Sequence, residues 1–246
     1  MGLEIKPDPR SAKEAGHTLV TDKTAIRDAA TVILVRDADR DPAILMGQRG
    51  ANAAFMPSKF VFPGGAVDPD DAFVPMARPI DPISASKLAL RPVTQLAPAP
   101  EALLGSAIRE VWEETGLRLG ADAQVDMPNG LGESWQAFLR TGQCPDPSAL
   151  RFFFRAVTPP GRPRRFDARF FIAPVDALTD DPDDFSNASD ELSHLHWVPL
   201  QEARQLDLAF ITEVVLAEVQ ASLPSLEAPE LVPFVLNDIT SRIERL

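Results

Sequence analysis

The sequence contains one cysteine, Cys144, and three histidines among its 246 residues. A single thiol cannot form an intramolecular disulfide, and with His17, His194 and His196 it makes too small a ligand set for a structural zinc site. A disulfide scaffold and a zinc module are therefore excluded. Cys144 has no histidine beside it in the sequence, so we do not expect it to act as a nucleophile. The chemistry must come from carboxylates or hydroxyls.

Basic residues are also few, with 24 Lys and Arg against 36 Asp and Glu and a net charge of −12. Such a surface repels phosphates, which excludes general binding to nucleic acid or to an anionic membrane. No run of 18 uncharged apolar residues occurs, and the first 30 residues lack the apolar core of a signal peptide. We expect a cytoplasmic protein without membrane or nucleic-acid partners. The oligomeric state stays open, a homo-oligomer included.

The 45% of apolar residues can fill one sizeable core, so we expect a single domain over residues 1–246. β-Branched and aromatic runs alternate with segments of helical pattern, which indicates a layered α/β or α+β fold. The expected strands cover residues 29–35, 43–46, 59–62, 148–157, 168–173 and 194–198, and the expected helices cover 84–90, 101–115, 133–140 and 201–223.

Two segments stand apart from this pattern. Residues 66–100 contain seven of the 24 prolines, too many for regular structure beyond one short helix. We interpret this segment as an insertion on the surface that a short glycine linker could replace. Residues 201–246 begin with a helical pattern, and we interpret them as a C-terminal helical extension.

The helix over 101–115 carries Glu110, Glu113 and Glu114 on the side opposite its apolar residues. These three acids repel one another, and they lie near Gly116, at the helix end where negative charge is disfavoured. Binding of Mg²⁺ or Mn²⁺ would remove both penalties, because hard cations prefer oxygen ligands. The alternative is a solvated acidic face, relieved by nearby arginines.

The stretch from Glu101 through Arg109 to Leu117, preceded by Phe62-Pro63-Gly64-Gly65, resembles the Nudix hydrolase signature G-x5-E-x7-R-E-U-x-E-E-x-G-U, with U aliphatic. The match is complete from Glu101 onward. Between Gly64 and Glu101 lie 36 residues where the signature has five. The signature is thus split, as in the branch that includes peroxisomal coenzyme A diphosphatases. Glu101 keeps the spacing to Arg109 and is our choice for the first acid, and Asp70, at the unsplit spacing from Gly64, is the alternative.

The resemblance implies a Nudix fold, a mixed sheet between helices, that hydrolyses a nucleoside diphosphate derivative with Mg²⁺ or Mn²⁺. It assigns Glu110, Glu113 and Glu114 to the metal. The catalytic residues it implies are Glu110, Glu113 and Arg109, which orients the glutamates through salt bridges. Glu110 is one candidate for the general base, and Glu191 is a second. A ligand sensor without catalysis is the alternative from another class.

The same branch implies coenzyme A or an acyl derivative as the substrate, with ADP-ribose, dinucleotides and oxidised nucleotides as runners-up. Residues 151–169 hold six arginines against one acid, which suits a substrate with an additional phosphate. The alternative is that some of these arginines pair with the acids of residues 180–184. The substrate-binding candidates are Gly64, Gly65, Arg49, Arg164 and Arg165.

Other conspicuous side chains have structural interpretations. Phe152, Phe154, Phe170 and Phe171 lie within expected strands, so we expect core packing rather than stacking on a base. Trp197 at a strand end is likewise expected in the core. His194 and His196 share a strand face, a spacing that can bind metal, but the glutamate cluster is the stronger candidate.

Overall fold

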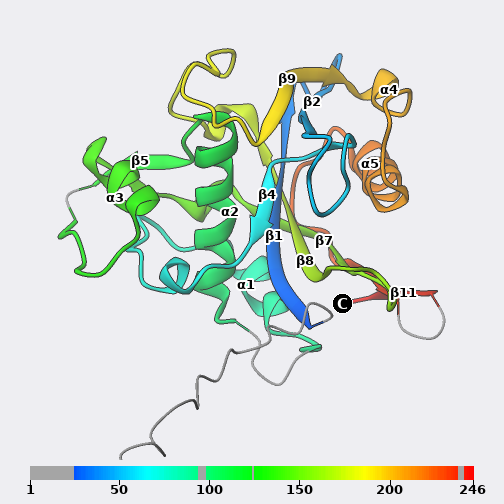
Figure 1. Ribbon diagram of the computed structural model, residues 1–246, viewed down its shortest axis with the longest axis horizontal. Coiled ribbons are helices and arrows are strands. Elements are labelled where there is room, and N and C mark those ends of the chain that lie inside the picture. The colour runs from blue at the N-terminus through cyan, green and yellow to red at the C-terminus, as the bar shows by residue number, and fades with distance from the viewer. Residues whose placement is uncertain (1–24, 94–97, 124, 238–240) are drawn as a thin grey trace, which may run out of the picture.

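A mixed β-sheet forms the centre of the molecule and has helices on both sides (Figure 1). The computed structural model describes residues 25–93, 98–123, 125–237 and 241–246. Within these residues the sheet has nine strands, in the order β11-β10-β7-β8-β1-β2-β3, with β4 paired to β1 and β9 paired to β2. The strands are β1 Ile26–Arg36, β2 Ala43–Arg49, β3 Phe60–Val61, β4 Gly64–Ala66, β7 Arg151–Val157, β8 Arg165–Pro174, β9 Leu192–Pro199, β10 Pro233–Asn237 and β11 Ser241–Arg245.

Strand β1 organises the sheet because it has a neighbour along both edges. It pairs in parallel with β8 on one side. On the other side its two halves pair antiparallel with different strands, Val35 with Ile44 of β2 and Thr31 with Gly64 of β4. The sheet therefore splays beyond β1, and the Gly64-Gly65 pair lies at the split. A separate two-stranded sheet consists of β5 Gly120–Asp122 and β6 Gln143–Pro145.

Each face of the main sheet has its own apolar core. One core joins Val32 and Leu34 of β1 to α2, α3 and part of the proline-rich segment. The other joins Ile33 and Val35 of β1 to α5. Neighbouring β1 side chains point to opposite faces, so this continuous apolar run is buried on both sides. The helices are α1 Pro82–Leu88, α2 Pro100–Thr115, α3 Glu133–Arg140, α4 Leu200–Ala203 and α5 Phe210–Ser222, with 3₁₀ turns at Pro69–Ala72, Pro147–Ala149 and Val175–Ala177.

The expected mixed sheet between helices is confirmed. The helices expected over 101–115 and 133–140 are present as α2 and α3. Gly116 ends α2 with a left-handed φ of 75°, as expected of a glycine after a helix. The helix expected over 201–223 is divided into α4 and α5, and between them the Asp207 carbonyl accepts a hydrogen bond from the amide of Phe60, the first residue of β3.

The described residues of the segment 66–100, which exclude 94–97, do not form a detachable surface segment. Val74, Ile80 and Leu88 are buried in the same core as α2, and Asp71 is completely buried. The many prolines prevent long regular structure, but they do not prevent the residues between them from packing. A glycine linker in place of this segment would therefore remove part of the core.

The helical extension expected over 201–246 is wrong for its last part. Residues 233–237 and 241–245 form a β-hairpin, and Phe234 of β10 pairs in parallel with Arg155 of β7. The helical pattern ends with α5, and the Pro-Phe-Val-Leu run that follows suits a strand at the sheet edge. In the part of the chain that the structure describes, no helix has the length and apolar character needed to cross a bilayer.

Candidate active site

The acidic side of α2 is turned toward β4 and is largely buried. Glu114 is 1% exposed and Glu110 is 8% exposed, whereas the Glu113 side chain keeps about a third of its surface (34%) in solvent. Carboxylates are almost never buried unless they are paired. A solvated acidic face therefore does not describe Glu110 or Glu114, and both need a partner that compensates their charge.

The two glycines of β4 lie against these carboxylates. The Gly64 amide donates a 2.8 Å hydrogen bond to Oε2 of Glu114. A Cβ atom at Gly65 would come within 2.3 Å of Oε1 of Glu110. Only a residue without a side chain permits this approach, which explains the glycine there. The structure thus brings Gly64 and Gly65 together with the predicted metal-binding glutamates.

Arg109 connects the cluster through its whole guanidinium group. Nη1 donates 2.9 Å hydrogen bonds to Glu110 and to Glu113, and Nη2 donates to the backbone carbonyl of Ala66. Nε and Nη2 together donate to both carboxylate oxygens of Asp71. Arg109 is 5% exposed, so these bonds are buried and fix the two glutamates relative to β4.

The acid that pairs with Arg109 is Asp71, and not Glu101 or Asp70. Glu101 is exposed in the first turn of α2, and Asp70 accepts a hydrogen bond from the Gly132 amide. The sequence also indicates Asp71, because Asp71 lies six residues after Gly65, just as Asp70 lies six residues after Gly64. Counting from the second glycine identifies the acid that the structure uses.

A second arginine lies on the other side of the cluster. Nη2 of Arg49 donates a 2.8 Å hydrogen bond to Glu191, and its Nη1 lies 3.8 Å from Oε1 of Glu114. Arg49 ends β2 and Glu191 directly precedes β9, which pairs with β2. The structure therefore brings both of these sequence candidates to the glutamates.

Burial and mutual repulsion shift the acids of this cluster. Burial, with added repulsion from Glu113 and Glu191, raises the pKa of Glu110 to about 7 although Arg109 opposes the shift. Burial and the charge of Glu110 raise the pKa of Glu114 well above its usual range, against the Gly64 hydrogen bond. The site as it stands has too little positive charge for its carboxylates.

Comparison with known proteins gives two informative relatives. A crystal structure of a Nudix hydrolase from Alicyclobacillus acidocaldarius is 28% identical, and the match covers 84% of this chain and 99% of the other with a TM-score of 0.58. A provisionally named nudix hydrolase 7 of Caenorhabditis elegans is 27% identical over 185 residues. The chain is similar in sequence and in fold to Nudix hydrolases. The match covers 72% of this chain and about half (52%) of the length of the C. elegans relative. No family model matches the sequence.

The Nudix glutamates fit a hard divalent cation in donor type and in charge. Oε1 of Glu114 is buried and accepts no hydrogen bond from any described residue. Among the described residues, Arg49 and Arg109 are the two cations that form ion pairs with five carboxylates, those of Asp71, Glu110, Glu113, Glu114 and Glu191. Within the described ranges no three acidic, histidine or cysteine side chains are arranged to hold one ion as they stand. Binding a cation would therefore require the glutamates to rotate.

The arginines of residues 151–169 do not form one anion-binding group. Arg155 and Arg169 are buried and pair with Asp167, and Arg169 also contacts Asp28. The acids near residue 180 pair elsewhere, with Arg118 and Arg36. Arg155 and Arg169 thus hold strands together within the sheet.

Arg164 and Arg165 lie apart from the glutamates. Arg165 pairs with Ile26 of β1, whereas Gly64 pairs with Thr31, five residues further along the same strand. At the rise of a β-strand this offset is about 17 Å. The structure therefore does not bring these two substrate-binding candidates to the Nudix glutamates.

The remaining candidates have structural roles. Phe152, Phe154 and Phe171 are at most 1% exposed and Phe170 is 7% exposed, so the prediction of core packing is confirmed. Burial raises the pKa of the Cys144 thiol, which disfavours a nucleophilic thiolate. The indole of Trp197 donates to the Pro182 carbonyl and packs under the guanidinium of Arg36.

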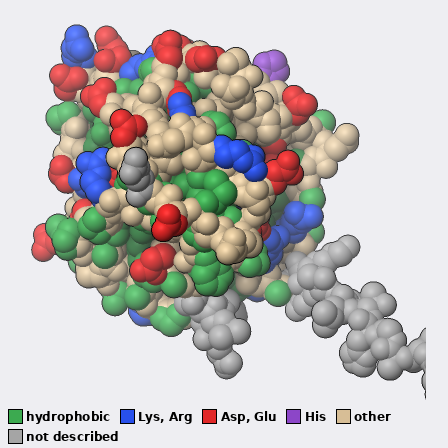
Figure 2. All heavy atoms as spheres, turned by 90° about the vertical axis from the view of Figure 1, so that its left-hand side faces the viewer, with side chains coloured by type: hydrophobic (Ala, Val, Ile, Leu, Met, Phe, Trp, Pro, Cys, Tyr) green, Lys and Arg blue, Asp and Glu red, His purple; other side chains and the backbone are tan. Residues whose placement is uncertain are grey.

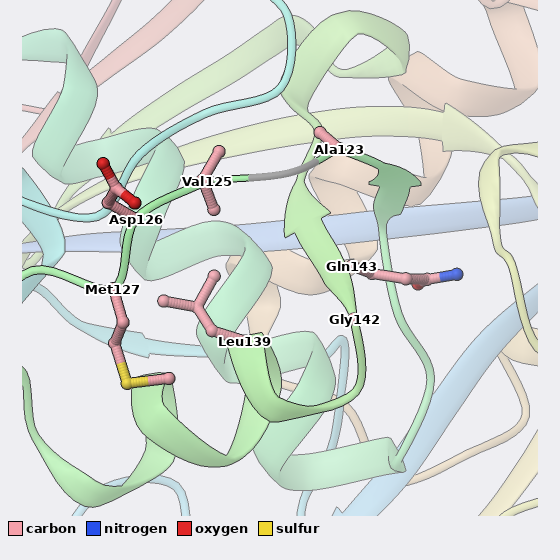
Figure 3. A pocket seen from close by; sticks show the side chains of 7 residues that line it. All are labelled: Ala123, Val125, Asp126, Met127, Leu139, Gly142 and Gln143. Atoms are coloured by element: carbon pink, nitrogen blue, oxygen red, sulfur yellow. The ribbon is translucent and has the colours of Figure 1, made fainter.

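A surface hollow of about 610 Å³ lies away from the glutamates, between β5, β6 and α3 (Figure 3). Its lining includes the apolar side chains of Val125, Met127 and Leu139, with Asp126 as its one carboxylate. Figure 2 shows hydrophobic side chains gathered on this face and charged side chains around them. The hollow lacks the paired acids that α2 carries.

Proposed function

We propose that the protein hydrolyses a diphosphate linkage in a nucleoside diphosphate derivative, with Mg²⁺ or Mn²⁺ held by Glu110, Glu113 and Glu114. The observation that carries this proposal is the buried Glu114 carboxylate, with one oxygen bound to the Gly64 amide and the other without a hydrogen bond from any described residue. A buried carboxylate oxygen without a hydrogen bond destabilises the fold, so its presence favours a function that uses it.

The divalent cation would neutralise the diphosphate and acidify a bound water. The protein's own residues prepare the site for this chemistry. Arg109 hydrogen-bonds to both Glu110 and Glu113 and so gathers the two carboxylates on one side of α2. The bare backbone of Gly65 leaves room beside Glu110. The water oxygen forms a bond to phosphorus, the bridging P–O bond breaks, and the water proton passes to a carboxylate of the site.

Two carboxylates are positioned to accept that proton. Glu110 is buried beside Glu114 and is hydrogen-bonded to Arg109, so it lies within the proposed metal site. Glu191 lies at the solvent side, with its side chain 54% exposed. Replacing Glu110 and Glu191 by glutamine, one at a time, shows which of them is the base, because loss of the base removes one limb of the pH–rate profile. Loss of a metal ligand instead raises the metal concentration needed for turnover.

The hydrolase and the sensor make different predictions for one experiment. The protein is incubated with Mg²⁺ or Mn²⁺ and coenzyme A, acyl-coenzyme A, ADP-ribose, NADH or diadenosine polyphosphates, and products are identified by mass. Glu114→Gln should lower turnover about 10²- to 10⁴-fold, as is typical of losing a catalytic group. Glu101→Gln, an exposed acid on the same helix, is the matched control and should keep full activity. Turnover unaffected by chelation, or by Glu114→Gln, contradicts the proposal.

Within this reaction class we propose coenzyme A or an acyl derivative as the substrate. The support is the split signature alone, because Arg164 and Arg165 lie apart from the glutamates. If Arg164 and Arg165 bind the 3′-phosphate, replacing both with glutamine raises the KM for coenzyme A and not for its 3′-dephospho form. Equal use of the two compounds favours the runners-up, ADP-ribose, dinucleotides or oxidised nucleotides.

A further inference from the structure

The two arginines of the site use their hydrogen-bonding capacity very differently. Every nitrogen of the Arg109 guanidinium donates to an oxygen, at distances of 2.9 or 3.0 Å. Arg49 makes one side-chain hydrogen bond, from Nη2 to Glu191. Its Nε is buried and has no partner among the described residues. Arg109 is therefore a fixed part of the fold, whereas Arg49 has donors to spare.

Arg49 also lies close to a carboxylate oxygen of Glu114. Nη1 of Arg49 lies 3.8 Å from Oε1 of Glu114, which is within ion-pair range but too long for a hydrogen bond. That oxygen is the buried one without a donor. Arg49 thus compensates the charge of Glu114 without occupying the carboxylate oxygen.

The backbone of Arg49 is fixed while its side chain is only partly held. The Arg49 amide donates to the Lys59 carbonyl, and the Arg49 carbonyl accepts from the Ser58 amide. The side chain is 20% exposed, and its one hydrogen-bond partner, Glu191, is half exposed. A single hydrogen bond to an exposed carboxylate is a weak restraint on a flexible side chain. The guanidinium can therefore move without moving β2.

We propose that Arg49 is the resident counter-cation of the metal-free site, and that a divalent cation bound to Glu114 displaces it. This inference rests on the proposed metal-dependent function. A cation on Oε1 of Glu114 would lie beside the guanidinium, and the two positive charges repel each other. The displaced guanidinium releases Glu191 and turns its free donors toward the opening of the site, where a substrate phosphate would bind. Metal binding and phosphate binding are thereby coupled through one residue.

The coupling predicts that Arg49→Met binds Mn²⁺ more tightly and ADP more weakly than the parent protein. This substitution keeps the apolar stem of the side chain and removes its charge. Without nucleotide, Arg49→Met should bind Mn²⁺ at least about tenfold more tightly than the parent protein, because the competing charge is gone. With Mn²⁺ saturating, it should bind ADP about tenfold more weakly, because the phosphate loses a donor. Free Mn²⁺ is measured by electron paramagnetic resonance, and ADP binding by calorimetry.

Two variants serve as controls for this experiment. Arg40→Met removes one positive charge at the exposed β1–β2 turn and should change neither affinity. Glu114→Gln should abolish the tight Mn²⁺ site. Unchanged or weaker Mn²⁺ binding by Arg49→Met, with Glu114→Gln defective, overturns the displacement and leaves the proposed function standing. Absence of Mn²⁺ binding by the parent protein, or Mn²⁺ binding unaffected by Glu114→Gln, overturns both.

A measurement on the parent protein keeps the inference testable if Arg49→Met fails to fold. The Nε–H resonance of Arg49, assigned by its absence in Arg49→Lys, should move when diamagnetic Mg²⁺ is added. The corresponding resonance of Arg155 should stay in place, because that guanidinium is buried against Asp167 at 2.8 Å. An Arg49 resonance that stays fixed at saturating Mg²⁺ contradicts the displacement.

Discussion

Arg109 and Asp71 form a two-point ion pair, with Nε donating to Oδ1 at 2.9 Å and Nη2 donating to Oδ2 at 3.0 Å. The two residues are 38 positions apart, and Asp71 is completely buried. Oδ1 also accepts a bond from the Trp135 indole, and Oδ2 accepts one from the Asp68 amide. The pair joins the proline-rich segment to α2 and α3, and through Arg109 it positions Glu110 and Glu113.

Asp71→Asn should therefore be strongly destabilising. The amide group would place N–H groups against the donors of Arg109 and leave a buried guanidinium without its counter-charge. Breaking a buried pair from one side costs about 3–5 kcal/mol of unfolding free energy. The control is Glu101→Gln, an exposed acid that should change stability by less than about 0.5 kcal/mol. Urea unfolding measures the stability of both variants, and an Asp71→Asn variant as stable as Glu101→Gln contradicts the role of Asp71.

Gly65→Ala should disrupt the glutamate cluster more than the fold. The new methyl group would lie 2.3–2.6 Å from the carboxylate of Glu110, so that side chain must move away. We expect turnover to fall by about 10² or more, because the proposed metal site would have one of its ligands displaced. Gly50→Ala is the matched control, since nothing lies within 4 Å of a Cβ there. Both variants are measured at saturating Mg²⁺, and full activity of Gly65→Ala contradicts the need for a glycine beside Glu110.

Local patterns predict the elements whose signals lie within a few residues. The bounds of α3 follow from its periodicity, and the end of α2 follows from Gly116, because capping and amphipathicity are local properties. The pairing of β10 with β7 has no such signal, since it joins residues about 80 positions apart by backbone hydrogen bonds. The helical expectation for the C-terminal residues failed for this reason.

The same distinction between local patterns and distant partners applies to the candidate site residues. The spacing of Glu110, Glu113 and Glu114 on one helix is local, so the sequence identifies them as a group. The partners of Arg155 and Arg169 are not local in this sense. An excess of arginines in one stretch is ambiguous until the strand register places Asp167 and Asp28 beside them. Composition alone could not separate anion-binding arginines from those buried in the sheet.

Gly105→Ala should destabilise the protein, against the ordinary trend for helices. Alanine in place of glycine in a helix interior usually stabilises by up to about 1 kcal/mol. Here the Cβ would lie 2.4 Å from the backbone carbonyl oxygen of Asp71, which cannot move alone. We expect a loss of about 1–3 kcal/mol in urea unfolding. Ser106→Ala, at the next position, removes a buried hydroxyl without a partner among the described residues and should not destabilise.

The metal-free protein should lose stability as the pH rises from about 4.5 to about 7. Burial raises the pKa of Glu110 to about 7, from an ordinary value of 4.5. Between these values the folded state holds a proton that the unfolded state has released, so deprotonation favours unfolding. The contribution of Glu110 is fully present below pH 4.5 and lost above pH 7, with a size of about 3 kcal/mol.

Glu110→Gln isolates this contribution because glutamine has nearly the same shape and does not titrate. In EDTA, the unfolding free energy of the variant relative to the parent should rise by about 3 kcal/mol between pH 4.5 and pH 8, measured by urea unfolding. Glu101→Gln controls for the loss of one charge from the same helix. Mg²⁺ should stabilise the parent most at high pH, because the cation competes with the proton for Glu110. A parent and a Glu110→Gln variant with the same pH dependence would show that the carboxylate is already compensated without a metal.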